Sequence, residues 1–171
     1  MNIQIANIND VTTIKNLLNE AYRGENSKQG WTSEADLISG KVRTSNHEVA
    51  LLITTNDSVF LKYINKSENV IGCVNLQVQQ TDLYLGMLAV APNLQAKGIG
   101  KQLLIEAEQH AKANNCNRIY MTVISVRKEL IDWYLRNNYI VTNIVKPFPT
   151  DHASGVPNQK LEFVVLEKFI F

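Results

Sequence analysis

The sequence predicts one α/β (α+β) domain over residues 1–171, built as a mixed central sheet with helices on its faces. Short apolar runs, about seven in all, indicate strands. Longer segments with apolar residues every three or four positions indicate amphipathic helices. Three of the strands follow one another through short turns and later ones are separated by helices, so we expect both antiparallel and parallel pairs.

The first elements are a short strand and an amphipathic helix. Ile3 and Ile5 suggest the strand. Apolar residues at helical spacing mark the helix: Val11, Ile14, Leu17, Leu18 and Ala21. Asn9 or Asp10 precedes this helix and is placed to cap it, because such side chains accept hydrogen bonds from the unpaired first N–H groups.

A polar stretch at 23–32 follows, and a second capping pattern comes after it. Ser33 and Asp36 resemble a variant capping box, which predicts a short helix through Leu37 and Ile38.

The segment 50–53 fits a buried strand or part of a helix. Ser45 and Glu48 have the Ser-x-x-Glu spacing of a capping box, and Val49, Leu52 and Ile53 fit one helical face. We therefore favour a helix here.

The centre of the chain is rich in strands. The segments 59–64, 70–79 and 83–90 are expected to form an antiparallel meander, because short turns join them. The third is almost continuously apolar, which is typical of a strand covered on both faces. Ala91-Pro92-Asn93 ends it.

Helices and strands alternate in the C-terminal half. A long helix is marked by Ile99, Leu103, Leu104, Ala107 and Ala111. It crosses over to a strand at 119–124, which should lie parallel to 83–90. A helix around 130–135 and strands at 139–145 and 161–167 follow. Asn114-Asn115 and Asn137-Asn138 are suited to the left-handed ends of the two helices.

Composition excludes several classes of function. Hydrophobic residues make up 45% and charged residues 19%, and the net charge is +1, so no overall field would gather nucleic acid or a membrane surface. No apolar run approaches the ~20 residues of a membrane span, and because residues 1–10 lack a basic segment followed by an apolar one, we expect no secretory signal. Cys73 and Cys116 lack metal-ligand spacing, and the three histidines are scattered. We expect a cytoplasmic protein with reduced cysteines and no metal.

The turn between the third strand of the meander and the long helix contains Gln95, Gly98 and Gly100. Two glycines allow the backbone to curl closely around a ligand. Successive N–H groups and the positive end of the helix dipole then favour an anion. A Walker A loop would need an earlier glycine and a Ser or Thr after Lys101, and a Rossmann turn would need a third glycine at Leu103. A turn without any ligand is the simpler alternative.

The Gln-x-x-Gly-x-Gly pattern resembles the acetyl-CoA signature of the GCN5-related N-acetyltransferases. Two further segments are similar to that family: 86–92, the strand and turn before the signature, and 133–139, which resembles its Phe-Tyr-x-x-x-Gly-Phe element. Asn138 stands there for glycine and Tyr139 for phenylalanine. The resemblance covers roughly residues 59–145 and implies a mostly antiparallel sheet that splits between two strands to admit acetyl-CoA.

Carried over residue by residue, the resemblance implies that acetyl-CoA binds along the end of one strand and the turn after it. The residues are Leu88, Ala89, Val90, Gln95, Ala96, Lys97, Gly98, Ile99, Gly100 and Lys101. One backbone N–H of the first three would face the thioester oxygen.

Tyr134 matches the family tyrosine that protonates the departing sulfur, a role suited to a phenol with a pKa near ~10. Its phase with Leu130 and Ile131 fits an ordinary core residue as well. Trp133, on a different face of the helix, is expected only to pack.

The general base is less clear. Glu25 in the polar loop is our candidate, with Glu34 and Asp36 as alternatives. Each also fits a solvated or helix-starting carboxylate. Tyr84 and Arg127 are expected near the cleft by analogy with the family.

The expected function is transfer of acetyl to the primary amine of a small metabolite. Acetylation of a protein or peptide, and a CoA-binding regulatory module without turnover, are the alternatives. The segments 23–27 and 30–32, with Trp31, suit an acceptor pocket or an ordinary loop. The apolar C-terminal strand suggests a homodimer.

Overall fold

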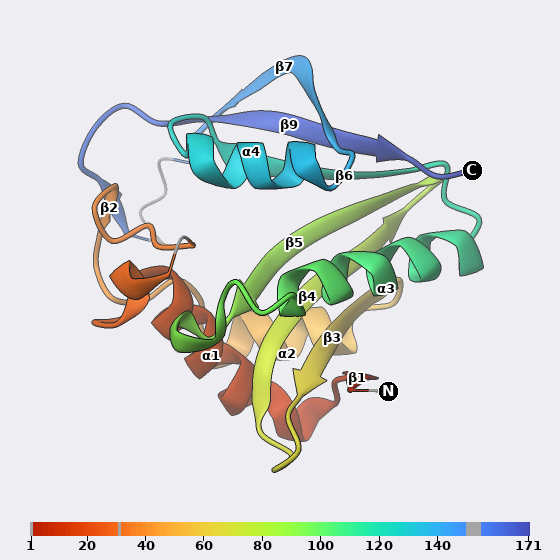
Figure 1. Cartoon of the computed structure of the whole chain (residues 1–171), viewed down its shortest axis with the longest axis horizontal. Coiled ribbons are helices and arrows are strands. Elements are labelled where there is room, and N and C mark those ends of the chain that lie inside the picture. Colours follow the sequence, from red (N-terminus) through yellow and green to blue (C-terminus); the bar gives the residue numbers. More distant parts are fainter. Residues whose placement is uncertain (1, 31, 150–154) are drawn as a thin grey trace.

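The structure is a computed structural model that describes residues 2–30, 32–149 and 155–171. One sheet of seven strands has the order β1-β3-β4-β5-β6-β9-β7 (Figure 1). These strands are β1 (Ile3–Ile5), β3 (Ser58–Ile64), β4 (Val70–Gln79), β5 (Asp82–Val90), β6 (Arg118–Ile124), β7 (Ile140–Pro147) and β9 (Glu162–Phe169). The pair β5–β6 is parallel and the other pairs are antiparallel. This confirms the mixed, mostly antiparallel sheet.

Four α-helices cover the two faces of the sheet (Figure 1). They are α1 (Val11–Arg23), α2 (Asn46–Thr54), α3 (Ile99–Ala113) and α4 (Lys128–Arg136). Buried apolar residues of α1 and α2 pack against Phe60, Cys73 and Ala89 on one face. Those of α3 and α4 pack on the other face against a larger core that includes Leu76 and Leu83. Each helix therefore buries the apolar stripe seen in its sequence.

The start of α1 differs from the prediction. A 3₁₀ turn, Ile8–Asp10, precedes the helix, and Asn7 caps that turn with its side-chain oxygen 2.9 Å from the N–H of Asn9. The Asp10 carboxylate accepts from the backbone N–H of Asn7 at 2.8 Å instead of capping α1. The capping signal was real, but it belongs to a turn that begins three residues earlier.

The short helix expected through Leu37 and Ile38 was wrong. Hydrogen bonds from the N–H groups of both residues to the Glu34 carbonyl form a single turn. The chain then enters β2 (Ile38–Ser39), which pairs with β8 (Val156–Pro157). Ile38 is buried with Ile124 and Leu161, so a distant contact overrides the local helix signal.

The helix predicted after Ser45 is confirmed as α2, and the Ser45 hydroxyl accepts from the N–H of Glu48 at 3.1 Å. The left-handed ends of α3 and α4 are confirmed as well. Asn115 has a φ of 54° and Asn138 a φ of 65°, which asparagine tolerates better than most residues.

The sheet splits between β5 and β6. The two strands pair only from Asp82 to Tyr84 and then diverge (Figure 1). At the closed end, Arg118 donates to Asp82 at 2.9 and 2.7 Å and to Glu167 of β9 at 2.7 Å. One guanidinium thus holds three neighbouring strands together where the split begins.

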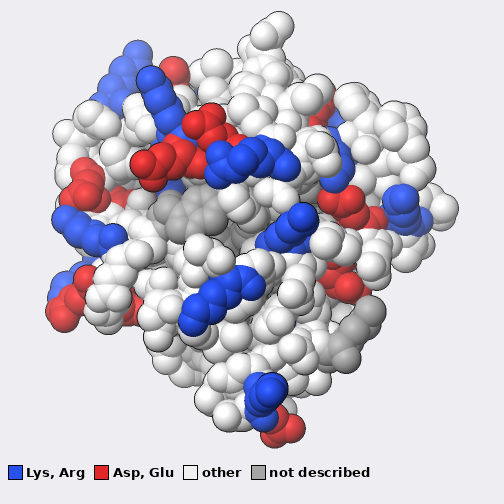
Figure 2. Space-filling model, in the orientation of Figure 1, with Lys and Arg blue, Asp and Glu red and all other residues white. Residues whose placement is uncertain are grey.

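In the described part of the chain, no helix is both long and apolar enough to cross a bilayer. No group of three His, Cys, Asp or Glu side chains among the described residues is arranged to hold a metal ion. Cys73 and Cys116 are buried free thiols. Acidic and basic side chains are interspersed over the face shown in Figure 2.

Candidate active site

The open edge of β5 presents backbone groups to the split. The N–H of Ala91 donates to the Ile71 carbonyl of β4 at 2.9 Å. Because backbone groups alternate along a strand, Ala89 also faces β4, whereas Leu88 and Val90 face the split. Two side-chain donors confirm this direction: Tyr22 donates to the Leu88 carbonyl at 2.9 Å and Gln95 to the Val90 carbonyl at 3.1 Å. The carbonyls of Leu88 and Val90 are therefore engaged, and their N–H groups point toward the opening.

A β-bulge in β5 sets the direction of the backbone groups that face the split. The register of β4 and β5 shifts between the pair Cys73–Ala89 and the pair Asn75–Gly86. As a result, Met87 and Leu88 oppose a single residue of β4. Met87 has a φ of 51°, an uncommon value for a residue with a side chain. Bulges of this kind commonly redirect a strand beside an active site.

The turn after β5 leads directly into α3. Gly98 has a φ of 81° and occupies the N-cap, and the N–H of Gln102 donates to its carbonyl at 3.0 Å. The backbone N–H groups from Gly98 to Lys101 come before Gln102, whose N–H is the first to donate within the helix, so the helix itself leaves them unpaired. They form the kind of site that binds phosphate.

Gln95 stabilises this turn with its side chain. The amide nitrogen donates to the Thr32 hydroxyl at 2.9 Å as well as to Val90, so it ties the polar loop to the end of β5. Gln95, Ala96 and Lys101 line a small cleft with the glycines, whereas Lys97 is exposed outside its lining.

Trp133 forms a wall of the same small cleft. A Cβ added to Gly100 would lie 3.3 Å from the Trp133 ring, so the indole and the start of α3 are in close contact. The residue lines the cleft together with its neighbour Tyr134. Sequence reasoning assigned Trp133 to packing alone, because adjacent helical positions point in different directions.

Tyr134 lies where this cleft meets a larger cavity. The larger cavity has a volume of about 460 Å³. Tyr22, Leu88, Leu130 and Tyr134 line both spaces, which therefore adjoin along these residues. The turn that precedes α3 lies on one side of this junction, and the larger cavity lies on the other.

Three phenols form what we term the tyrosine cluster: Tyr134 and Tyr139, which are buried, and Tyr22, which is half-buried. Tyr134 contacts Tyr139 edge to face with ring centres 5.6 Å apart. Burial raises the pKa of each member. For Tyr134, the pKa lies well above 10, since burial disfavours the phenolate and the neighbouring tyrosines add to the effect. Its hydroxyl therefore stays protonated and able to donate.

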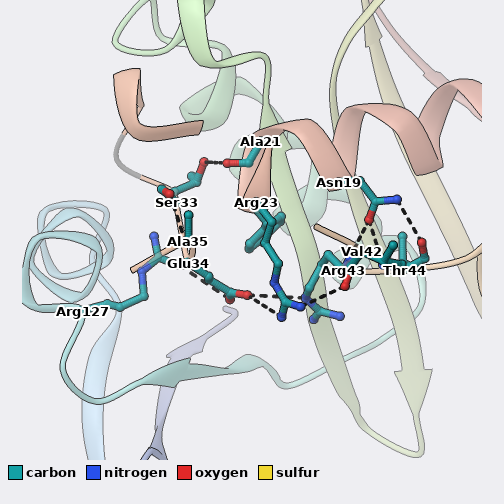
Figure 3. A network of polar contacts seen from close by, with 12 residues as sticks. Asn19, Ala21, Arg23, Ser33, Glu34, Ala35, Val42, Arg43, Thr44 and Arg127 are labelled. Atoms are coloured by element: carbon teal, nitrogen blue, oxygen red, sulfur yellow. Dashed lines mark hydrogen bonds and ion pairs between the residues drawn. The ribbon is translucent and has the colours of Figure 1, made fainter. Parts of the chain in front are cut away.

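The wall of the larger cavity contains a group of charged residues. Glu34 lies 3.2 Å from Arg23 and 3.9 Å from both Arg43 and Arg127 (Figure 3). These side chains come from the end of α1, two loops and the start of α4. Lys146 of β7 lines the same cavity, as do Tyr84 and Arg127, in agreement with their expected place near the cleft.

The other base candidates lie elsewhere. The Glu25 side chain is 84% exposed and pairs with Lys41 at 3.3 Å, and it lines neither space at the junction. Asp36 pairs with Lys28 at 2.6 Å on the surface. Trp31 lies outside the described residues.

The fold is that of an acetyltransferase. A model of the acetyltransferase (GNAT) family matches residues 12–139, and the chain belongs to this family. It is a GNAT N-acetyltransferase that uses acetyl-CoA. No curated protein matches the sequence significantly.

Solved structures share the fold at low sequence identity. The smu.2055 protein of Streptococcus mutans is 16% identical, with a TM-score of 0.74 and 99% of each chain covered. A GNAT-family acetyltransferase of Streptococcus pneumoniae is 16% identical with a TM-score of 0.70, covering 99% of this chain and 98% of that one. The ribosomal-protein-S18-alanine N-acetyltransferase of Escherichia coli is 13% identical with a TM-score of 0.71, covering 98% and 92%.

Proposed function

We propose that the protein transfers the acetyl group of acetyl-CoA directly to the primary amine of a small metabolite. The observation that carries this proposal is the junction of two spaces at Tyr22, Leu88 and Tyr134. One space begins at an anion-binding turn and the other is a separate cavity, so a donor and an acceptor would meet at the junction.

The residues fit the coenzyme in two respects. The N–H groups from Gly98 to Lys101 would bind the diphosphate, because they converge at the positive end of α3. Leu88 and Val90 would pair with the amide groups of the pantetheine arm, since they face the open edge of β5. Ala89 supports this edge from behind through its pairing with Cys73. The indole of Trp133 would close one side of the path.

Acetyl-CoA supplies an activated thioester, whose C–S bond breaks as the amine nitrogen forms a C–N bond to the acetyl carbon. The N–H of Leu88 would stabilise the negative charge that develops on the carbonyl oxygen. Tyr134 would donate its hydroxyl proton to the departing sulfur, and the proton lost by the amine restores the balance. The products are an N-acetyl amide and free CoA thiol.

The size of the acceptor cavity favours a small molecule. A volume of about 460 Å³ lies within the range of small-molecule sites, ~300–1,000 Å³. A neighbour with the same fold is named for acetylating a ribosomal protein, so a protein acceptor is the competing possibility. A peptide would require an extended groove leading to Tyr134.

Two measurements test the proposal. Calorimetry should show that CoA and acetyl-CoA bind, and thiol release should follow when small primary amines are added. Absence of CoA binding at millimolar ligand and modest salt would refute the cofactor site. Thiol release with peptides but with no small amine would refute the acceptor class.

The identity of the base has its own test. Glu25→Gln should abolish turnover if Glu25 takes the proton of the amine. Full activity of this variant would remove Glu25 from the mechanism and leave Glu34, which lines the cavity, or water as the proton acceptor.

A further inference from the structure

The acceptor cavity carries an excess of positive charge. Its charged lining residues, among those the structure describes, are Arg23, Arg43, Arg127, Lys146 and a single acid, Glu34. Four cations and one anion give the described part of the lining a formal charge of +3, although the whole chain has a net charge of only +1. The charge is thus concentrated beside the reaction centre, where surrounding protein screens it less than bulk water would.

The single carboxylate of Glu34 faces three guanidinium groups in this wall. It lies 3.2 Å from Arg23, which is hydrogen-bonding distance, but 3.9 Å from Arg43 and Arg127. The side chains of Arg23 and Glu34 are 1% and 9% exposed, so this closest pair is buried in the wall (Figure 3). The Arg43 side chain is 26% exposed, which leaves part of its surface toward the cavity.

The cationic side chains of the cavity lie close to the junction at which the acetyl group would be transferred. The hydroxyl of Tyr22 donates to the Leu88 carbonyl at the junction, and the Arg43 guanidinium lies 5.6 Å from the centre of the same ring. Lys146 and Arg127 line the same cavity. An acceptor whose amine is beside Leu88 and Tyr134 could therefore place a second group near these cations.

The positive charge of the lining determines which second functional group on the acceptor would bind favourably. An amine with no other charged group arrives as an ammonium, and the excess of cations in the described lining repels it. A diamine or polyamine is repelled more strongly. A carboxylate or phosphate on the same molecule matches the planar donors of arginine and compensates for the charge of the ammonium.

We propose that the acceptor carries an anionic group in addition to its amine, and that this group binds between Arg43, Arg127 and Lys146. The inference rests on the proposed acetyl transfer and narrows its substrate class to zwitterionic or acidic amines, such as amino acids and aminoalkyl phosphates. Glu34 holds the guanidinium groups in place as a positioning residue.

The first experiment compares matched amines in a thiol-release assay with saturating acetyl-CoA. The series contains amino acids of increasing chain length, their carboxamides, the corresponding aminoalkyl phosphates and diamines. The acid should exceed its carboxamide in kcat/KM by at least about tenfold, the expected effect of one charge-assisted hydrogen bond. Diamines should be the poorest substrates. The carboxylate and phosphate arms identify the type of anion.

Variants locate the anion site. Arg43→Gln and Lys146→Gln should each raise the KM of the acid-bearing acceptor about tenfold, with the KM of acetyl-CoA unchanged. Lys66→Gln removes the same charge from the exposed β3–β4 turn and should change neither value. Arg43 and Lys146 are not fully buried, so both variants should fold, and their melting temperatures will verify this.

A binding measurement decides the question even without turnover. Calorimetry on the CoA-loaded protein should detect an N-acetylated amino acid but not its carboxamide, and Arg43→Gln should weaken that binding about tenfold. Equal use or binding of acid and carboxamide, a preference for diamines, or variants that behave like Lys66→Gln would overturn the anion site. If no amine releases thiol but this binding pattern holds, the acetyl-transfer proposal fails and the anion site stands.

Discussion

Replacing Tyr134 with phenylalanine tests the catalytic proposal by removing one oxygen atom at the junction of the two spaces. The phenyl ring retains its edge-to-face contacts with Trp133 at 4.9 Å and Tyr139 at 5.6 Å. The free energy of unfolding should therefore change by no more than about 1 kcal/mol. Any large loss of turnover must then come from the missing hydroxyl group.

The expected loss follows from the role of a general acid. Such groups typically accelerate a reaction ~10²–10⁴-fold. Water in the adjoining cavity can protonate the thiolate in place of the phenol, so we expect a fall in kcat of roughly 10- to 100-fold, or about 1.4–2.7 kcal/mol. The affinity for CoA should be unchanged, because the N–H groups of the turn are intact.

The assay is thiol release under single-turnover conditions, with calorimetry for CoA affinity. Tyr139→Phe is the matched control, because it removes the same atom from a neighbouring buried ring that lines neither space. Since burial raises the pKa of Tyr134 well above 10, native kcat should show no decline from its ionisation below pH ~10. Unchanged kcat in Tyr134→Phe would refute the acid role.

Three further predictions concern the cofactor site, stability and assembly. Gly100→Val adds side-chain atoms where a Cβ alone would lie 3.3 Å from Trp133, so the dissociation constant for CoA should rise at least tenfold by calorimetry, and unchanged affinity would contradict the proposed path. The tyrosine cluster has raised pKa values, so its members stay neutral in the folded state after they ionise in the unfolded chain. Stability is retained below pH ~10 and should fall above it by about 1.4 kcal/mol per tyrosine per pH unit, measured by urea unfolding; a flat profile would contradict this. The homodimer stays a prediction, but the C-terminal strand expected to form it was the wrong one, because β9 lies between β6 and β7 and has no free edge. We now place the contact at edge strand β7 with its exposed Ile140 and Ile144, and a monomer mass in light scattering across working concentrations would exclude it.

Much of the fold could be predicted because its signals are local. The meander β3–β4–β5 and the elements from α3 to β7 were placed within one or two residues, since strand alternation and helical spacing are properties of short segments. The short pair β2–β8 was missed because two residues carry no periodicity and the partner lies more than a hundred residues away. The helix predicted through Leu37 and Ile38 was wrong for the same reason.

The candidate site also contains some residues that the sequence could predict and others that it could not. The turn with Gly98 and Gly100 was identified from contiguous residues, and Tyr134 from its resemblance to a family. Tyr22 and Arg43 were missed because their importance depends on partners that no local pattern links to them, Leu88 for one and Glu34 for the other. Glu34 was considered only as a possible base or helix start. Its place among guanidinium groups depends on the fold, which brings Arg23 at the end of α1 and Arg127 at the start of α4 to the same carboxylate.

The clamp formed by Arg118 affects how the cofactor site works. Its bonds to Asp82 and Glu167 secure the closed end of the split, and the bulge at Met87 turns β5 away further along. Separation of the strands is thus part of the folded structure, and no strand pairing has to be broken when a ligand enters. The free energy of binding is then available for positioning the thioester against the amine.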